Sequence, residues 1–157
     1  MGIFLSCLKK IQTKNKRIGV ITESIIPAIT PILEFEGRIY RGCPSNVDAN
    51  KILQIGKDIY VGSSGKLDDY INHSCNPNCY VYSVGTRSFL YTMSAIPKNT
   101  EITFDYSLTS SDSEDEWSMD CKCGSYNCRK KISGYKYLPE DFKLKYQKMG
   151  IVPRFLL

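Results

Sequence analysis

The sequence predicts a mostly β protein that is built from several small sheets and ends in one short helix. Between residues 17 and 106 the chain consists of short β-rich segments separated by turn residues, without a helical stripe of convincing length. Such short segments favour several small sheets over one large sheet. The 157 residues, 42% of them hydrophobic, are enough for one domain with its own core.

The β-rich segments follow one another along the chain. The clearest alternation places Tyr80, Tyr82 and Val84 on one face of a strand. Val81 and Ser83 would lie on the opposite face. The predicted strand regions are residues 18–24, 31–40, 57–62, 79–85, 88–96 and 101–107.

The last third of the chain differs in composition. Residues 107–117 are polar and carry four carboxylates between Asp112 and Glu116, which is typical of a solvated linker or mobile loop. Residues 138–150 are the best helix candidate. Pro139 suits a first helical turn, the acidic residues after it suit the positive end of the helix, and Gly150 suits its C-terminal cap.

Charge and the start of the chain narrow the class of protein. The net charge of +5 makes the protein mildly basic. The sequence contains no run of 18 apolar residues, so no transmembrane helix is predicted.

The first residues lack the apolar core and cleavage site of a signal peptide, which favours a reducing, intracellular location. They also fit the pattern for myristoylation of Gly2, with Cys7 available for palmitoylation. The alternative is an N-terminal segment that packs on the domain.

The cysteines point to a metal rather than to disulfides. Their number, seven, is odd, and Cys121, Cys123 and Cys128 lie within eight residues. Three thiolates need a fourth ligand to complete a tetrahedral zinc site. Cys75 and Cys79, far away in the sequence, are the candidates. The alternative is that these cysteines are free thiols.

Four ordered motifs and this cluster resemble one family. They are "RIGVIT" at residues 17–22, "EFEGRIY" at 34–40, "INHSCNPN" at 71–78 and "EITFDYS" at 101–107, followed by C-x-C-G-x3-C-R from Cys121 to Arg129. The set resembles SET-domain protein lysine methyltransferases with a post-SET zinc module, and looks closest to small stand-alone bacterial or viral members. The resemblance implies a SET fold whose C-terminal segment is threaded through a loop as a pseudoknot.

The resemblance also implies a division of the chain and a metal site. An N-terminal segment (1–15) would precede the SET domain (16–108), an acidic loop (109–120), the zinc module (121–133) and a helical tail (134–157). One structural zinc ion would be bound by Cys75, Cys121, Cys123 and Cys128.

The implied reaction is methyl transfer from S-adenosylmethionine to a lysine amine. Tyr106 would be the catalytic residue at the reacting centre and would also contact the cofactor. Asn72 and His73 would bind the cofactor, and Arg17, Ile18 and Gly19 would line it through their backbone. Phe104 would set product multiplicity, because it lacks a hydroxyl that holds a water against the amine, which favours di- or trimethylation.

Two positions depart from the family pattern. Arg17 stands where the first glycine of a G-x-G motif is usual, so its side chain narrows the approach to the cofactor. Asp69 and Tyr70 replace an arginine-containing version of the residues before the third motif. Neither change removes a reacting group.

The implied partner is a lysine-containing basic protein, such as a histone tail or another chromatin protein, and a eukaryotic host would place the enzyme in the nucleus. One alternative is a catalytically weak, zinc-stabilised module that binds lysine-rich tails. Another is a nucleic-acid-binding zinc protein, but the cysteine spacing is not that of a nucleic-acid finger, so direct nucleic-acid contact is not expected. The acidic residues 112–116 would either steer a basic tail or form a solvated linker.

Overall fold

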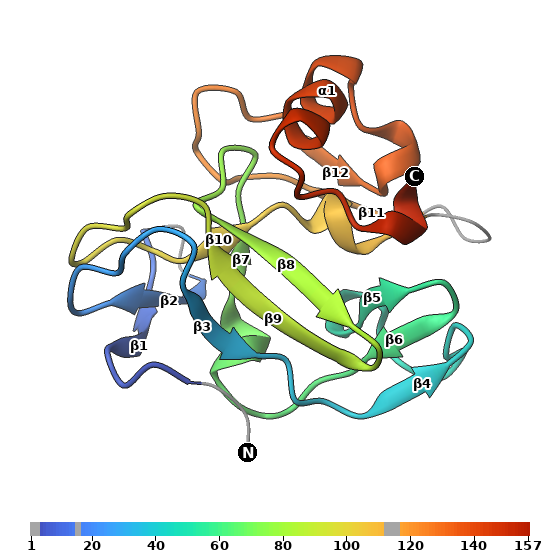
Figure 1. The fold of residues 1–157 in the computed structure, drawn as a ribbon, viewed down its shortest axis with the longest axis horizontal. Helices are drawn as coiled ribbons and strands as arrows, with labels where there is room; N and C mark the ends of the chain where they lie inside the picture. The colour runs from blue at the N-terminus through green and yellow to red at the C-terminus, as the bar shows by residue number, and fades with distance from the viewer. Residues whose placement is uncertain (1–3, 15–16, 112–116) are drawn as a thin grey trace.

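The computed structural model describes residues 4–14, 17–111 and 117–157, and it confirms a mostly β protein with a short C-terminal helix (Figure 1). The expectation about Gly2 and the expectation about the acidic residues 112–116 lie outside the described residues. Within the described ranges, no helix is both long enough and apolar enough to cross a bilayer.

The β structure of the described residues consists of five small sheets. The central antiparallel sheet has the order β3-β9-β8, and a second three-stranded sheet has the order β4-β6-β5. The pairs β1-β2 and β11-β12 are antiparallel, whereas β7-β10 is parallel. The strands are β1 (Leu8–Gln12), β2 (Ile18–Thr22), β3 (Pro31–Glu34), β4 (Ile39–Arg41), β5 (Leu53–Gly56), β6 (Ile59–Val61), β7 (Asn72–His73), β8 (Cys79–Val84), β9 (Arg87–Thr92), β10 (Thr103–Phe104), β11 (Ser118–Asp120) and β12 (Lys131–Ser133).

Short 3-10 turns lie between or after the strands, and the one α-helix among the described residues lies near the C-terminus. The helix α1 (Glu140–Lys148) begins after Pro139, which occupies the N-cap position rather than the first turn. Gly150, with φ of +68°, ends it as predicted. The 3-10 turns are η1 (Ala49–Lys51), η2 (Leu67–Tyr70), η3 (Tyr106–Thr109), η4 (Tyr135–Tyr137) and η5 (Arg154–Leu156).

The main core lies around the central sheet. Ile32, Leu33 and Leu90 are fully buried there. The predicted alternation in β8 holds, because Val81 is buried whereas Tyr82 and Val84 are exposed. Cys7 packs against the same core and β1 pairs with β2, so the described part of the N-terminal segment is integrated into the domain.

A second, smaller core forms where the C-terminal segment returns to the domain. It contains Leu108 from η3 and the completely buried Tyr146 from α1. In Figure 1, α1 and the β11-β12 pair lie together on one side of the central sheet. The last residues of the predicted acidic loop 109–120 form the strand β11, which pairs with β12.

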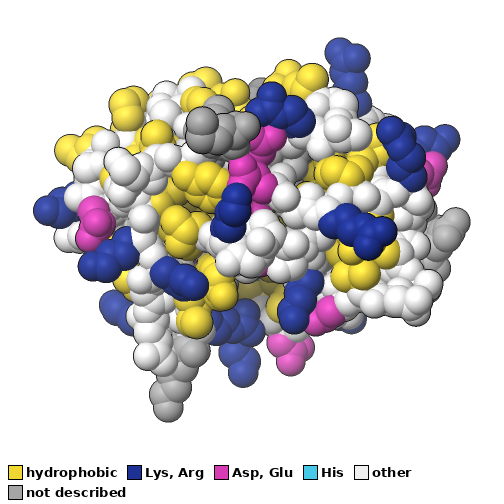
Figure 2. Space-filling model, turned by 90° about the horizontal axis from the view of Figure 1, so that it is seen from below, with side chains coloured by type: hydrophobic (Ala, Val, Ile, Leu, Met, Phe, Trp, Pro, Cys, Tyr) yellow, Lys and Arg dark blue, Asp and Glu magenta, His cyan; other side chains and the backbone are white. Residues whose placement is uncertain are grey.

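Charged side chains are spread out on the face that Figure 2 shows. Lys and Arg residues are scattered there among hydrophobic and uncharged groups, and no single basic stripe forms on this face. The scattering agrees with the spread of basic residues along the sequence.

Candidate active site and cysteine cluster

The parallel pair β7-β10 brings two distant motifs into contact. Thr103 lies opposite Asn72, and Phe104 lies opposite His73. The pairing continues beyond β7, where the N–H of Ser74 donates to the Phe104 carbonyl at 3.1 Å. The segments around residues 72 and 104 therefore lie side by side, as the threaded topology implied, and we call this paired region the centre.

Tyr106 is fixed to this centre at both its backbone and its hydroxyl. Its N–H donates to His73 Nδ1 at 3.1 Å, and its hydroxyl donates to the Ile71 carbonyl at 2.7 Å. The ring packs against Phe104, with 4.9 Å between the ring centroids. Burial raises the pKa of Tyr106 to about 12, so its hydroxyl stays protonated at neutral pH.

The predicted strand 101–107 is shorter than expected, and this difference orients Tyr106. The strand β10 ends at Phe104, and the carboxylate of Asp105 accepts from the Ser107 N–H at 3.0 Å. Such a cap favours a helical turn over continued extension. Tyr106 therefore begins the 3-10 turn η3 instead of extending the strand.

Asn72 reaches the strand that carries Gly19. Its Nδ2 donates to the Ile18 carbonyl at 3.1 Å and to Glu101 Oε1 at 2.8 Å. A Cβ atom on Gly19 would lie 2.5 Å from Glu101 Oε1 and 2.8 Å from Asn72 Nδ2. Glycine at this position is thus what allows the three residues to meet. Glu101 did not emerge as a site residue from the sequence, although it opens the motif "EITFDYS".

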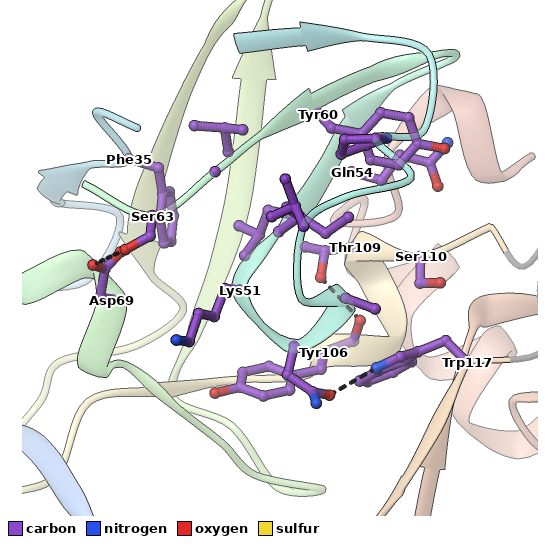
Figure 3. Close-up of a pocket in the computed structure, with 18 of the residues that line it drawn as sticks. Phe35, Lys51, Gln54, Tyr60, Ser63, Asp69, Tyr106, Thr109, Ser110 and Trp117 are labelled. Carbon is purple, nitrogen blue, oxygen red and sulfur yellow. Dashed lines mark hydrogen bonds between the residues drawn. The ribbon is translucent and has the colours of Figure 1, made fainter. Parts of the chain in front are cut away.

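A cavity of about 980 Å³ opens beside Tyr106 (Figure 3). Arg17, Phe104 and Tyr106 all line it. The loop that carries η1 and the strands β5 and β6 form one wall, and Trp117 lines another part. Trp117 Nε1 donates to Asn50 Oδ1 at 3.1 Å, which ties η1 to the segment that precedes β11.

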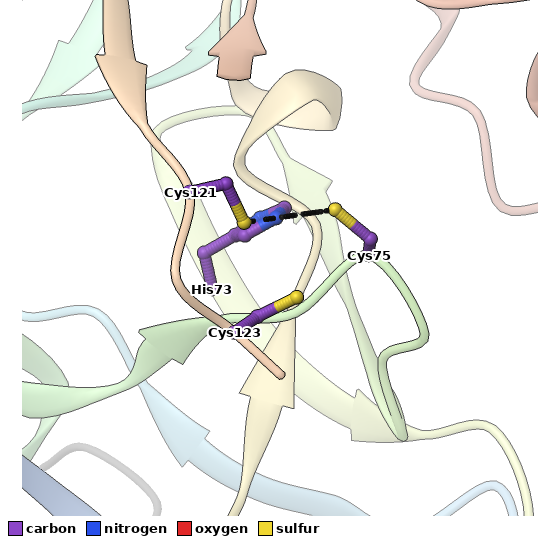
Figure 4. A group of neighbouring side chains, drawn as sticks. All are labelled: His73, Cys75, Cys121 and Cys123. Carbon is purple, nitrogen blue, oxygen red and sulfur yellow. Dashed lines mark hydrogen bonds between the residues drawn. The ribbon is translucent and has the colours of Figure 1, made fainter. Parts of the chain in front are cut away.

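The sulfur atoms of the predicted metal ligands lie close together, next to the His73 side of the β7-β10 pair. Cys75 Sγ lies 3.7 Å from Cys121 Sγ, which in turn lies 3.6 Å from Cys128 Sγ. The ligand atoms of His73, Cys75, Cys121 and Cys123 all lie within 4.8 Å of one another (Figure 4). Cys79, the other candidate for the fourth ligand, is buried in the main core instead.

The chemistry of the cluster fits a soft divalent cation, and it can hold a zinc ion. Burial raises the pKa of Cys75 to about 11 and also raises that of Cys121. For Cys123 burial acts in the same direction, but hydrogen bonds from the Cys75 backbone and from Ser125 lower the pKa to about 6. Buried thiols in such proximity become thiolates when a metal compensates their charge.

His73 competes with Cys128 as the fourth ligand, and its hydrogen bonds argue against it. Burial lowers the pKa of His73 to about 4, so the ring is neutral. Its Nδ1 accepts from the Tyr106 N–H, which leaves the ring proton on Nε2. Nε2 lies 3.2 Å from Cys75 Sγ and would donate to it, whereas a metal ligand needs a free lone pair.

A buried carboxylate joins the Tyr106 turn to the C-terminal part of the chain. Asp105 is 1% exposed and accepts two hydrogen bonds from Arg129, at 2.7 and 2.8 Å. The hydroxyl of Tyr146, on α1, donates to the same carboxylate at 2.8 Å. Burial alone would raise the pKa of Asp105, but Arg129 holds it below its usual value. We call these three residues the Asp105 junction.

A mostly β protein in which a parallel pair joins two distant motifs, with a tyrosine directly after that pair, has the arrangement that the resemblance to SET domains implied. Residues 17–107 match the SET domain family, and the chain belongs to this family. The resemblance inferred from the motifs is thereby confirmed.

Curated relatives carry the names of histone-lysine methyltransferases. ASHH3 of Arabidopsis thaliana is 28% identical over 80% of this chain and 38% of its own length. An H3 lysine-36-specific enzyme of Candida albicans is 30% identical over 95% of this chain and 20% of its own length. SETD1B of Homo sapiens is 41% identical over 53% of this chain and 4% of its own length. The chain thus spans less than two fifths of these relatives.

Solved structures agree with the fold. KRYPTONITE, in complex with mCHH DNA, an H3(1-15) peptide and SAH, has a TM-score of 0.67 and 26% identity, over 80% of this chain and 29% of that one. SUVH6 of Arabidopsis thaliana, in complex with SAM, has a TM-score of 0.69 and 21% identity, over 83% of this chain and 33% of that one.

Proposed function

We propose that the chain is an S-adenosylmethionine-dependent protein-lysine N-methyltransferase. The observation that carries this proposal is the position of Tyr106, which lines the cavity and whose hydroxyl donates to the carbonyl of Ile71, the residue before β7. In-line methyl transfer requires that donor and acceptor are aligned and that water is excluded. Tyr106 is partly buried and fixed beside a cavity of this size, which supports both requirements.

The proposed cofactor site is the strip that connects Arg17, Ile18 and Gly19 to Asn72 and His73. When bound, the cofactor would supply an electrophilic methyl group on a sulfonium. The side chain of Asn72 is already oriented by the Ile18 carbonyl and by Glu101. The SAH in the KRYPTONITE complexes supports this choice of cofactor.

Replacing Gly19 by alanine is expected to weaken cofactor binding about tenfold. The new methyl would push Glu101 away from Asn72, and a hydrogen bond to a charged group contributes about 1.5–3 kcal/mol. Calorimetric titration with S-adenosylhomocysteine measures the effect. Gly56→Ala is the matched control, because a Cβ atom there meets only Ile59 at ordinary contact distance. Unchanged affinity in Gly19→Ala would argue against this strip as the cofactor site.

We further propose that zinc binds to Cys75, Cys121, Cys123 and Cys128. Elemental analysis is expected to find one zinc ion per native chain and none in Cys121→Ser. The substitution should also lower the melting temperature, because structural zinc contributes folding free energy directly. Cys43→Ser, which removes an exposed cysteine, should leave both values unchanged.

The fourth ligand is tested separately. Cys128→Ser should lose zinc, whereas His73→Gln should retain it. The opposite pattern would show that the histidine set binds the metal.

Phe104 supports di- or trimethylation as the product. It is 2% exposed, lines the cavity and contacts both Phe35 and Tyr106. Phe104→Tyr would add a hydroxyl that can hold a water against the amine, so we expect mass spectra to shift toward the monomethyl product. Phe35→Tyr serves as the control, because Phe35 lines the same cavity without contact to Tyr106 in the ring pairs described. An unchanged product distribution in Phe104→Tyr would contradict this role.

The proposed substrate is a lysine in a basic protein tail, for which the histone names of the relatives and the H3 peptide of KRYPTONITE give support. Such a substrate would place the protein inside the cell, and on chromatin in a eukaryotic host. Incubation with labelled cofactor and a panel of basic proteins, histone H3 included, tests the proposal. Calorimetry with the cofactor separates it from the alternative of a catalytically weak reader, which would bind lysine-rich tails without cofactor.

A further inference from the structure

Lys51 lines the same cavity as Tyr106, and the function proposed above does not use it. It is the last residue of η1, on the wall of the cavity formed by the loop before β5. In Figure 3 its side chain extends into the cavity, and its amine lies toward the same side as the Tyr106 hydroxyl. A lysine amine in this cavity belongs to the chemical class of the proposed substrate.

The backbone around Lys51 is held in place on both sides. Asp48 caps η1, since its carboxylate accepts from the Asn50 N–H at 2.9 Å and its carbonyl accepts from the Lys51 N–H at 2.8 Å. The side chain of Asn50 accepts from Trp117 across the cavity. These contacts hold the backbone of Lys51 at the cavity wall, whereas its long side chain is exposed and can change rotamer.

The charged groups around Lys51 favour its amine within the cavity. Across residues 4–14, 17–111 and 117–157, no carboxylate forms an ion pair with Lys51, whereas Lys9, Lys66 and Lys143 each have one. Asp58, Asp68 and Asp69 line the cavity, and their negative charge favours an amine within it. Of the basic side chains that line the cavity, Arg17 cannot act as an acceptor, because a guanidinium does not lose its proton.

We propose that Lys51 is methylated by the centre of its own chain and that its unmodified amine competes with protein substrates for the cavity. In this step the neutral Nζ forms an N–C bond while the S–C bond of the sulfonium cofactor breaks. The proton that the ammonium gave up passes to solvent, and the demethylated cofactor leaves as a thioether. This inference rests on the proposed methyltransferase activity.

The test is peptide mapping by mass spectrometry after the purified chain is incubated with S-adenosylmethionine. Methyl groups are expected on Lys51 in the native chain and none there in Tyr106→Phe. Lys57→Arg, which changes an exposed lysine on the turn before β6, should leave the modification of Lys51 intact. Dilution should not change the fraction modified per unit time, because the reaction occurs within one chain.

A second measurement needs no cofactor turnover. In calorimetry with a lysine-containing H3 peptide, Lys51→Ala should bind about twofold or more tightly than the native chain, since apparent affinity scales with the fraction of chains whose cavity is free. Lys57→Arg should bind the peptide as the native chain does. Equal affinity in Lys51→Ala would overturn the competition.

The outcomes separate this inference from the proposed function. Methyl transfer to histone H3 without modification of Lys51 would overturn the inference and leave the proposed function standing. Modification of Lys51 that rises with protein concentration would show transfer between chains and would overturn the reaction within one chain. No transfer to Lys51 or to any protein of the basic panel would refute the proposed function itself.

Discussion

Asp105→Ala is expected to destabilise the chain by about 3–5 kcal/mol, because it leaves the buried guanidinium of Arg129 without its counter-charge and with only the Ser107 hydroxyl as a hydrogen-bond acceptor. Only 9% of the Arg129 side chain is exposed, and its two hydrogen bonds to Asp105 are replaced by nothing in the variant. The hydroxyl of Tyr146 loses its acceptor at the same time. Chemical denaturation measures the change in the free energy of unfolding.

A second arginine–carboxylate pair provides the control. Arg87 makes two hydrogen bonds to Glu34, at 2.7 and 2.9 Å, but 59% of the Arg87 side chain is exposed. Glu34→Ala should therefore cost no more than about 1 kcal/mol, because water solvates the remaining guanidinium. Equal costs for the two variants would show that burial does not set the strength of the Asp105 junction.

Tyr106→Phe is expected to reduce kcat/KM for methyl transfer by about 10²-fold or more, a typical effect of removing one positioned hydroxyl from a reacting centre. The fold should persist, because the backbone hydrogen bond to His73 and the ring contact with Phe104 do not need the hydroxyl. Cofactor affinity should change little, whereas kcat should fall. Tyr82→Phe, an exposed position on β8, is the matched control and should retain full activity.

The pH dependence of the reaction distinguishes the role of this hydroxyl further. With its pKa raised to about 12, Tyr106 stays a neutral donor throughout the range in which the substrate amine deprotonates. The rate should thus rise with pH as the amine loses its proton, with no fall near pH 10, where an ordinary tyrosine ionises. A falling limb centred near pH 10 that disappears in Tyr106→Phe would contradict the raised pKa.

Most of the fold could be predicted from the sequence because its signals are local. Alternation identified β8, and the acidic residues and Gly150 identified α1. The resemblance of ordered motifs identified the family. The structure pairs Asn72 with Thr103, and it joins His73 to the backbone of Tyr106. The ligand set and the residue roles remain predictions.

What could not be predicted depends on contacts between distant segments. Asp105, Arg129 and Tyr146 come from three segments that are distant in the sequence, and no spacing or periodicity indicates that one carboxylate accepts hydrogen bonds from both of the others. Lys51 likewise looks like an ordinary polar loop residue, because a cavity wall is visible only after β5 and β6 have folded beside η3. The β-rich pattern of residues 101–107 predicts a strand that continues past Phe104. The strand stops there because the side chain of Asp105 caps the turn that follows, and the pattern does not reveal this cap.

The Asp105 junction has a consequence for synthesis on the ribosome. Proteins grow from the N-terminus, and their domains fold as units once enough of the chain has emerged. The turn that holds Tyr106 reaches its final partners only when residue 146 has left the exit tunnel, since Tyr146 closes the junction. A nascent chain whose residue 146 is still inside the exit tunnel therefore carries all of the early motifs while the Asp105 junction is incomplete, and the turn that holds Tyr106 gains its last contact only after α1 has emerged.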